Sequence, residues 1–364
     1  GVGGVLVFLP QICLIFFCLT LLEDVGYMAR AALVMDRLMR RVGLPGKAFV
    51  PMLSAHACAV PAIMATRMIE DRRDRLVTIL ILPLLTCSAR LPVYAMVTAL
   101  LFRNDPARAA LVFVGAYSLG MIAAVTMAFV FQRTILPGQT QPLVIELPDY
   151  RRPSLKLALV TTLDRGRIFL RKAGTVILAI AVVLWWLSSY PVLDRADLAP
   201  AAEAELAALE ARAEAFAAAG DLEAAEAAQA EADNLWNRFG LAHSFAGRAG
   251  HAIEPIIRPL GFDWQIGVGV VSSFAAREVI VSTLAILYGL GEEGAEADAL
   301  FDVMRASTWP DGRPVFSFAT CISLLVFFVL AMQCLPTQAV TRRETGQWRW
   351  AFLQLGYMTV LAYV

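Results

Sequence analysis

Charged residues are scarce in this sequence. They make up 17% of its 364 residues, and the 31 basic and 31 acidic side chains leave a net charge of zero. A chain without a basic excess has no electrostatic basis for binding nucleic acid, and we expect no such partner. Hydrophobic residues make up 59% of the chain, and its mean hydropathy is +0.64. This composition argues against a soluble domain and predicts a membrane protein in contact with lipid.

The sequence also lacks the cysteine spacing of a disulfide framework or of a CxxC zinc site. Its first hydrophobic stretch, Gly1 to Leu22, has neither the charged start nor the cleavage site of a secretory signal peptide. Because the sequence starts inside this stretch, we expect an earlier part of the protein to be missing. The six cysteines, all in apolar segments, are Cys13, Cys18, Cys58, Cys87, Cys321 and Cys334.

Apolar runs of about 20 residues, enough to cross a bilayer, recur along the chain. They predict an all-α polytopic fold in which residues 132–172 form a polar, basic loop. The predicted spans are 5–22, 76–102, 109–131, 173–190, 316–335 and 348–364.

Two further stretches, at about 48–67 and 265–289, are interrupted. In the first, small residues, a histidine, a cysteine and Pro61 break the run before it can span. In the second, Arg277 and Glu278 lie in the middle. Broken backbone at membrane depth is tolerated only inside protein or beside a watery cavity, and paired interruptions point to a transporter's binding site. We therefore predict a transporter built around two facing broken segments.

Loop charges predict the orientation, because short loops rich in Lys and Arg stay in the cytoplasm. The first broken segment then enters from the cytoplasm and the second from the opposite face, so the halves form an inverted repeat. The alternative is that 265–289 crosses outright. Basic loops lie at 30–47, 67–75, 133–172 and 342–349, and acidic ones at 191–264 and 290–314.

Three parts of the chain follow from these patterns: a first membrane half at 1–190, an extramembrane part at 191–240 and a second membrane half at 241–364. The extramembrane part is rich in Ala and Glu between Asp194 and Asn237. It predicts a helical hairpin that acts as a solvated spacer or, alternatively, as a docking arm. Its predicted turn is Gly220-Asp221, and its predicted seam is Leu206, Leu209, Phe216 and Leu222.

Several longer motifs, in order, cover nearly all of the chain except the hairpin. With them the sequence resembles the membrane domain of the bacterial ferrous iron transport protein B (FeoB) family, whose two Gate regions are related to those of nucleoside transporters. The motifs are Gly3 to Pro10, Leu22 to Arg30, Val60 to Arg67, Thr86 to Tyr94, Glu254-Pro255 with Pro259 to Trp264, Ala276 to Val279, and Arg342 to Gly346.

The resemblance implies uptake of Fe²⁺ across the bacterial inner membrane by a multi-pass protein that is not itself an enzyme. GTP and Mg²⁺ would bind a GTPase domain upstream or on another chain, since no G-x-x-x-x-G-K-[ST] motif is present and residues 43–48 lack its spacing. Small accessory iron-transport proteins are expected partners, and a homo-oligomer is left open. Two departures affect the passage: Ala55-His56-Ala57 stands where the family more often has Gly-Phe-Gly, and Arg277 replaces the usual Lys.

Three cysteines, Cys58, Cys87 and Cys334, lie close to prolines in membrane segments. Helix breaks there would aim side chains at a cavity, and Fe²⁺ accepts thiolate, imidazole, thioether and carboxylate donors. A transporter also holds its ion loosely enough to release it. The resemblance implies that these three cysteines matter for iron passage. The alternative is ordinary burial, because cysteine packs as a small hydrophobe.

Seven other residues are candidates for the passage or for its gating. His56 and Met64 are predicted ligands or gate residues, with structural burial as their alternative. Glu278 either attracts the cation or pairs with Arg277 or Arg90. Glu23 and Asp24 lie at the end of a predicted span. They are either a solvated pair, a cation collection point or partners of Arg30.

Three rival functions remain open at this point. A Gate-type carrier of nucleosides or other organic solutes would need a polar hydrogen-bonding cluster, which the sequence does not suggest. A membrane protease using Ser54 and His56 would need a third, orienting group. A scaffold without transport activity would act through the Ala/Glu hairpin.

Overall fold

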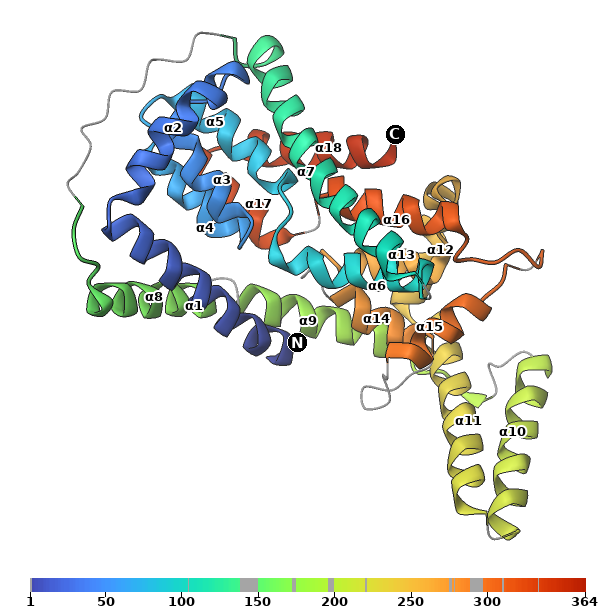
Figure 1. Ribbon diagram of the computed structural model, residues 1–364. Helices are drawn as coiled ribbons and strands as arrows, with labels where there is room; N and C mark the ends of the chain where they lie inside the picture. The colour runs from blue at the N-terminus through green and yellow to red at the C-terminus, as the bar shows by residue number, and fades with distance from the viewer. Residues whose placement is uncertain are drawn as a thin grey trace.

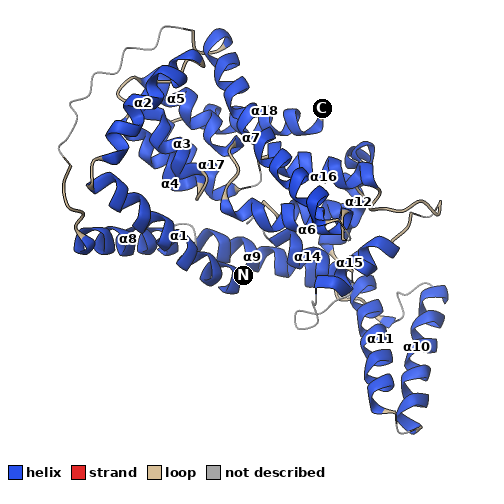
Figure 2. Ribbon diagram, in the orientation of Figure 1, coloured by secondary structure: helices blue, strands red, loops and turns tan. Residues whose placement is uncertain are grey.

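The computed structural model describes residues 2–103, 105–137, 150–171, 175–195, 200–219, 221–274, 277, 279–288, 297–309, 311–332 and 334–364. Over these residues every named element is a helix, which agrees with the all-α prediction (Figures 1 and 2). The α-helices are α1 Val2–Asp24, α2 Tyr27–Arg41, α3 Phe49–Ala55, α4 Ala59–Ala65, α5 Arg72–Ile81, α6 Leu91–Leu101, α7 Pro106–Thr134, α8 Leu155–Phe169, α9 Thr175–Ser189, α10 Pro200–Ala218, α11 Leu222–His243, α12 Phe245–Ile257, α13 Trp264–Ser272, α14 Val279–Leu287, α15 Ala297–Ala306, α16 Phe318–Leu330, α17 Leu335–Thr345 and α18 Trp348–Tyr363.

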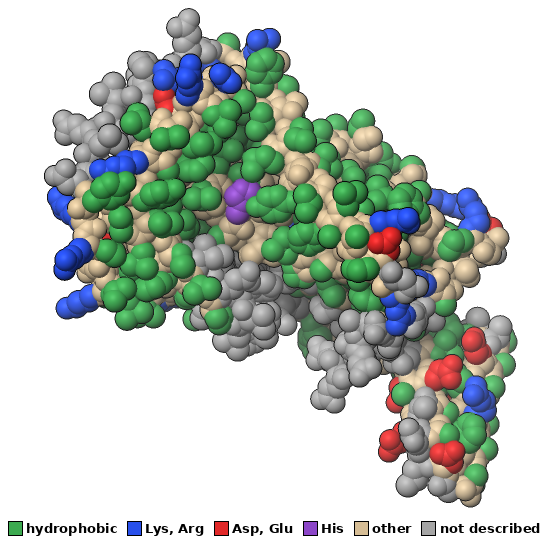
Figure 3. All heavy atoms as spheres, in the orientation of Figure 1, with side chains coloured by type: hydrophobic (Ala, Val, Ile, Leu, Met, Phe, Trp, Pro, Cys, Tyr) green, Lys and Arg blue, Asp and Glu red, His purple; other side chains and the backbone are tan. Residues whose placement is uncertain are grey.

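Much of the outer surface is apolar. Three described stretches are long and apolar enough to cross a membrane, namely Arg72–Leu101, Pro106–Thr134 and Phe318–Thr345. Figure 3 shows hydrophobic side chains over most of the visible face of the main body, with basic side chains gathered around α2 and α5 and acidic ones on the hairpin of α10 and α11. So large an apolar surface is suited to lipid, which makes the chain an integral membrane protein.

The first of these stretches is broken between α5 and α6. Pro83 has no N–H group, so the helical hydrogen bond to the carbonyl of Ile79 cannot form. Gln354 of α18 supplies the missing donor, because its Nε2 lies 2.9 Å from that carbonyl and 3.2 Å from the carbonyl of Leu80. The hydroxyl of Tyr357 also donates to Leu80, at 2.7 Å. Side chains of α18 thus replace the main-chain donors that the break removes.

A fully buried arginine stabilises the far side of the same break. The guanidinium group of Arg90 donates hydrogen bonds of 2.9 Å to the carbonyls of Pro83, Leu84 and Leu85. These carbonyls lie just before Cys87, so Arg90 holds the non-helical backbone that leads to this cysteine. Its described contacts are with carbonyl oxygens rather than with a carboxylate.

A second broken stretch joins α16 to α17. Ala331 and Cys334 both have extended backbone, and Pro336 follows in the first turn of α17, where proline is tolerated. Arg277, which is also buried, lies with Nη2 3.5 Å from the carbonyl of Ala331. Each half of the chain therefore has a buried arginine near the backbone that precedes a cysteine at a helix break: Arg90 at three carbonyls and Arg277 at one.

The Ala/Glu-rich stretch forms the paired helices α10 and α11, which project from the main body in Figure 1. The predicted seam is wrong in one respect: Phe216 is 36% exposed, whereas Leu206, Ala213, Ala228 and Ala232 are buried. Small alanines thus make up most of the buried contact between the two helices, and the ring of Phe216 lies outside it. The predicted loop at 132–172 also differs, because its part from Leu155 to Phe169 forms α8, capped by the Ser154 hydroxyl.

Candidate functional site

Cys58 and Cys87 lie at neighbouring helix breaks. Each directly precedes a helix and has extended backbone: Cys58 (φ −156°, ψ 132°) precedes α4, and Cys87 (φ −97°, ψ 166°) precedes the 3₁₀ turn Ser88–Arg90. The amide and hydroxyl groups of Ser88 both donate to the carbonyl of Ala57, at 3.4 and 2.9 Å. Because Ala57 precedes Cys58 and Ser88 follows Cys87, this double contact brings the two cysteines close together.

Cys334 has the same local position in the second half. It directly precedes α17 with φ −155° and ψ 97°. The amide of Leu335, the residue after it, donates to the carbonyl of Phe274 at 3.1 Å. In the second half, the α13–α14 break thus contacts the α16–α17 break. In the first half, the α3–α4 break contacts the α5–α6 break in the same way.

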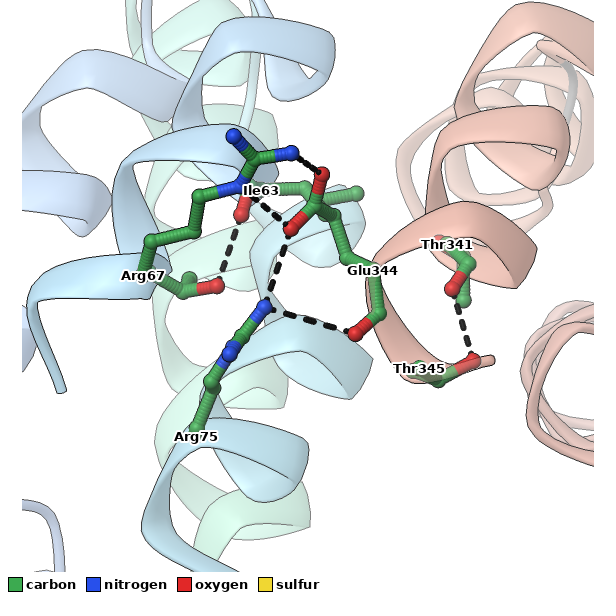
Figure 4. A network of polar contacts seen from close by, with 7 residues as sticks. Ile63, Arg67, Arg75, Thr341, Glu344 and Thr345 are labelled. Atoms are coloured by element: carbon green, nitrogen blue, oxygen red, sulfur yellow. Dashed lines mark hydrogen bonds and ion pairs between the residues drawn. The ribbon is translucent and has the colours of Figure 1, made fainter. Parts of the chain in front are cut away.

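An ion-pair cluster fixes how α4 and α17 lie against each other. Arg67, just after α4, donates from Nε and Nη2 to the Glu344 carboxylate at 2.8 and 2.6 Å, and Arg75 of α5 donates to it at 2.9 Å. Figure 4 shows Glu344 reaching from α17 toward both arginines. The Glu344 side chain is only 2% exposed, so its charge depends on these partners.

These contacts place Cys58 and Cys334 at the same end of a helix pair. α4 and α17 pack side by side (Figure 1), and Arg67 and Glu344 meet at their C-terminal ends. The helices therefore run in the same direction, and the residues before their first turns lie at the common opposite end. Together with the contact between Ala57 and Ser88, this arrangement places the helix starts that follow the three predicted cysteines on the same side of the α4–α17 pair.

His56 lies beside the same region, between α3 and α4. Its Nδ1 atom is 3.1 Å from the carbonyl oxygen of Thr86 and 2.6 Å from the hydroxyl of Tyr117 on α7. The His56 and Tyr117 rings stack with 5.3 Å between their centroids. Because Thr86 directly precedes Cys87, the imidazole is tied to the backbone of a predicted site residue.

The other predicted residues are more dispersed. Met64 is partly buried on α4, and Glu278 lies outside the described residues. At the end of α1, Glu23 is exposed, whereas Asp24 accepts a hydrogen bond from the amide of Ser154 at 2.6 Å. The arginine proposed as a partner of this acidic pair makes other contacts: Arg30 donates to the carbonyl of Gly26 and lies over the ring of Tyr150.

Within the described part of the chain, no three His, Cys, Asp or Glu side chains are grouped so that they could hold a metal ion. A transport site does not require such a closed group, because an ion that binds too tightly cannot leave. The roles assigned to the cysteines, His56 and Met64 stay predictions.

Sequence reasoning missed the partners that position these residues. Thr86, Tyr117 and Gln354 act through tertiary contacts that no local pattern reveals. Glu344 did carry a signal, since it is the acidic residue within the motif Arg342 to Gly346 and follows two arginines in a span-terminal position.

Comparisons with known families and proteins agree with one another. Residues 5–101 and 170–348 match the Gate family, described as nucleoside recognition, and residues 113–165 match a family described as the C terminus of ferrous iron transport protein B. No solved structure matches the chain.

Curated relatives match along the whole chain. An Fe(2+) transporter FeoB of Leptospira biflexa is 43% identical over 367 residues, and one of Leptospira interrogans is 42% identical over 368; the match covers 100% of this chain and 48% of each relative. A protein of Porphyromonas gingivalis described as a fusion of Fe(2+) transport protein A and Fe(2+) transporter FeoB is 38% identical, with 42% of it covered. The chain thus spans about half the length of these relatives, and it belongs to the ferrous iron transport protein B family as a membrane part that carries the Gate regions.

Proposed function

We propose that this chain forms the passage through which Fe²⁺ crosses the bacterial inner membrane. The observation that supports the proposal is that Cys58, Cys87 and Cys334, which come from three separate stretches, each directly precede a helix after a break. The names of the relatives, Fe(2+) transporters, support the choice of ion. The chain would cross the membrane several times, with the basic side chains around α2 and α5 in the cytoplasm.

The donor chemistry of this region fits a borderline-soft cation. Thiolate and imidazole donors favour Fe²⁺ over Mg²⁺ or Ca²⁺, which prefer oxygen. Arg90 occupies three of the carbonyl oxygens that the break before Cys87 exposes. Arg90 already binds those oxygens, so we assign the passing ion to the sulfur and imidazole groups.

We further propose that the two halves form an inverted repeat, with re-entrant segments at α3–α4 and α13–α14. Two backbone hydrogen bonds support this. Ala57, beside the break of the first segment, accepts from the amide that follows Cys87, and Phe274, beside the break of the second, accepts from the amide that follows Cys334. Equivalent contacts at equivalent breaks are what a repeated unit would produce.

The coupling to GTP would lie outside this chain. Because the chain spans about half of its relatives, a GTPase domain fits in the remaining length, and nucleotide state would act by favouring one arrangement of the broken segments. The fusion described for Porphyromonas gingivalis suggests an accessory protein of the transport protein A type as a partner.

The test is anaerobic Fe²⁺ uptake into proteoliposomes by the full-length protein with Cys58, Cys87 and Cys334 changed one at a time to Ser. We expect each variant to lose at least about tenfold in uptake rate, because a hydroxyl is a much poorer ligand for Fe²⁺ than a thiolate. Cys321→Ser is the matched control, since Cys321 is fully buried within α16 and should leave uptake unchanged.

The same vesicles should take up no nucleoside. Full Fe²⁺ uptake by all three cysteine variants would contradict the proposed passage, and nucleoside uptake without Fe²⁺ uptake would favour an organic-solute carrier instead.

A further inference from the structure

His56 makes both of its described ring hydrogen bonds through one nitrogen. Nδ1 lies 3.1 Å from the carbonyl oxygen of Thr86 and 2.6 Å from the hydroxyl oxygen of Tyr117, while the two rings stack. The side chains are partly buried and come from separate elements, the α3–α4 break and the middle of α7. This arrangement fixes the orientation of the imidazole plane.

The two contacts of Nδ1 bear on which nitrogen carries the proton. A carbonyl oxygen only accepts hydrogen bonds, so a hydrogen bond to Thr86 requires a proton on Nδ1, whereas a hydrogen bond donated by the Tyr117 hydroxyl requires an unprotonated Nδ1. The tautomer with the proton on Nδ1 satisfies the carbonyl of Thr86, and the Tyr117 oxygen then accepts from the same N–H group. In this neutral tautomer Nε2 bears a lone pair, which is the form of histidine that binds metal ions.

We propose that Nε2 of His56 is a ligand for the transported cation and that Tyr117 is its positioning residue. Metal-binding histidines commonly donate their other ring nitrogen to a carbonyl group, which fixes the tautomer and the ring orientation. Here Thr86 is that carbonyl, and it directly precedes Cys87, so the nitrogen donor and the sulfur donors belong to one region. The inference rests on the proposed function and adds a nitrogen ligand to it.

The alternative is that His56 and Tyr117 only pack together. The two explanations differ in what the hydroxyl group of Tyr117 does. If the pair only packs, stacking is sufficient and the hydroxyl affects stability alone. If Tyr117 positions a ligand, loss of the hydroxyl weakens metal binding through His56, and only when His56 is present.

The experiment measures anaerobic Co²⁺ binding to the purified full-length protein, with visible absorption to report the ligands. The variants are Tyr117→Phe, His56→Phe and the double variant, all of which keep two stacked aromatic rings. We expect Tyr117→Phe to weaken Co²⁺ binding about tenfold, the low end of the usual effect of losing such an outer partner. His56→Phe should weaken binding at least as much and change the absorption bands, and the double variant should bind like His56→Phe alone.

Tyr363→Phe is the control, because the Tyr363 hydroxyl donates to the carbonyl of Ile256 at the exposed end of α18. Unchanged Co²⁺ affinity in Tyr117→Phe, or an equal loss when Tyr117→Phe is added to His56→Phe, would overturn the role of Tyr117. If the absorption bands of bound Co²⁺ are the same in His56→Phe as in the wild type, His56 is not a ligand. This result holds even if the other variants fail to fold. If the three cysteine variants lose Fe²⁺ uptake while the His56 variants do not change, only this inference fails and the proposed passage stands.

Discussion

At the scale of single residues, Asp263 shows how burial affects a charge. It directly precedes α13, is 6% exposed, and accepts a hydrogen bond from the amide of Ile266 at 2.8 Å. Burial raises the pKa of its carboxyl group to about 6, and the hydrogen bonds from Ile266 and Tyr288 only partly oppose this change. The folded protein therefore binds this proton more tightly than the unfolded chain, and its stability decreases as the pH rises from about 4 through about 6.

We predict that Asp263→Asn stabilises the protein at high pH. Asn caps a helix about as well as Asp and has no charge to bury. A pKa difference of about two units corresponds to about 3 kcal/mol, which Asn should recover in the free energy of unfolding at pH 8. The gain should fall by about half at pH 5. Thermal unfolding in detergent at both pH values measures it, and a gain that does not change with pH would contradict this account.

The features of the candidate site differ in how far away in the sequence the residues that produce them lie. Breaks near Cys58, Cys87 and Cys334 could be predicted because a nearby proline disturbs the helix within a few residues. The contact of His56 with Tyr117 could not, because α7 is about 60 residues further on and only packing brings it there. Glu278, predicted either to attract the cation or to pair with Arg277 or Arg90, lies outside the described residues.

At the scale of elements, one buried carboxylate links α17 to the end of α4 and to α5. Glu344 binds Arg67 through two hydrogen bonds and Arg75 through another, and its side chain is almost fully buried. Removing one member of such a group leaves the others with unpaired charge, which is costly where water is excluded. The two arginines are partly exposed, so water would offset part of that cost.

We predict that Glu344→Gln lowers the free energy of unfolding by about 2 kcal/mol, less than for a fully buried pair because of this exposure. The unfolding temperature in detergent should fall by several degrees. Glu70→Gln is the matched control: Glu70 pairs with Lys47 at 2.8 Å, but its side chain is 88% exposed, and its loss should leave the unfolding temperature unchanged. Equal shifts for the two variants would mean that burial of Glu344 is not the cause.

The elements also differed in how readily the sequence predicted them. Apolar length predicted α7, and the Ala/Glu composition predicted the α10–α11 hairpin. The helix α8 was missed because basic and polar residues surround its apolar stretch, and its cap at Ser154 is a weak signal in a proline-rich loop. The hydrogen bonds between α5 and α18 were missed because their acceptors are backbone carbonyl groups, which every residue has and which a sequence pattern does not reveal.

At the scale of the whole molecule, the chain segments that enter and leave the α10–α11 hairpin are joined to each other where they meet the membrane part. We call this junction the closed base. The amide of Phe245 donates to the carbonyl of Tyr190 at 2.8 Å, and the rings of Phe245 and Trp186 stack. The chain thus leaves α9 and returns to α12 at nearly the same place. The base of α11 contacts α9, α12 and α14, whereas α10 packs mainly on α11.

We predict that replacing residues 208–232, the outer part of the hairpin, by a short Gly/Ser linker preserves Fe²⁺ uptake by the full-length protein. The base of α11 keeps its contacts with α9 and α12, although the partly exposed ion pair of Glu210 with Arg195 is lost, and the three cysteines belong to other elements. Uptake into proteoliposomes and the unfolding temperature should both match the wild type. Lost uptake at an unchanged unfolding temperature would identify the hairpin as a docking arm or the active part of a scaffold.

The closed base of the hairpin has a practical consequence for imaging. A membrane protein that lies mostly within a detergent micelle offers few features by which single particles can be aligned in electron microscopy. The outer turn between α10 and α11 is a natural point to graft a rigid reporter protein, because the two paired helices would transmit its position to α12 and the membrane core.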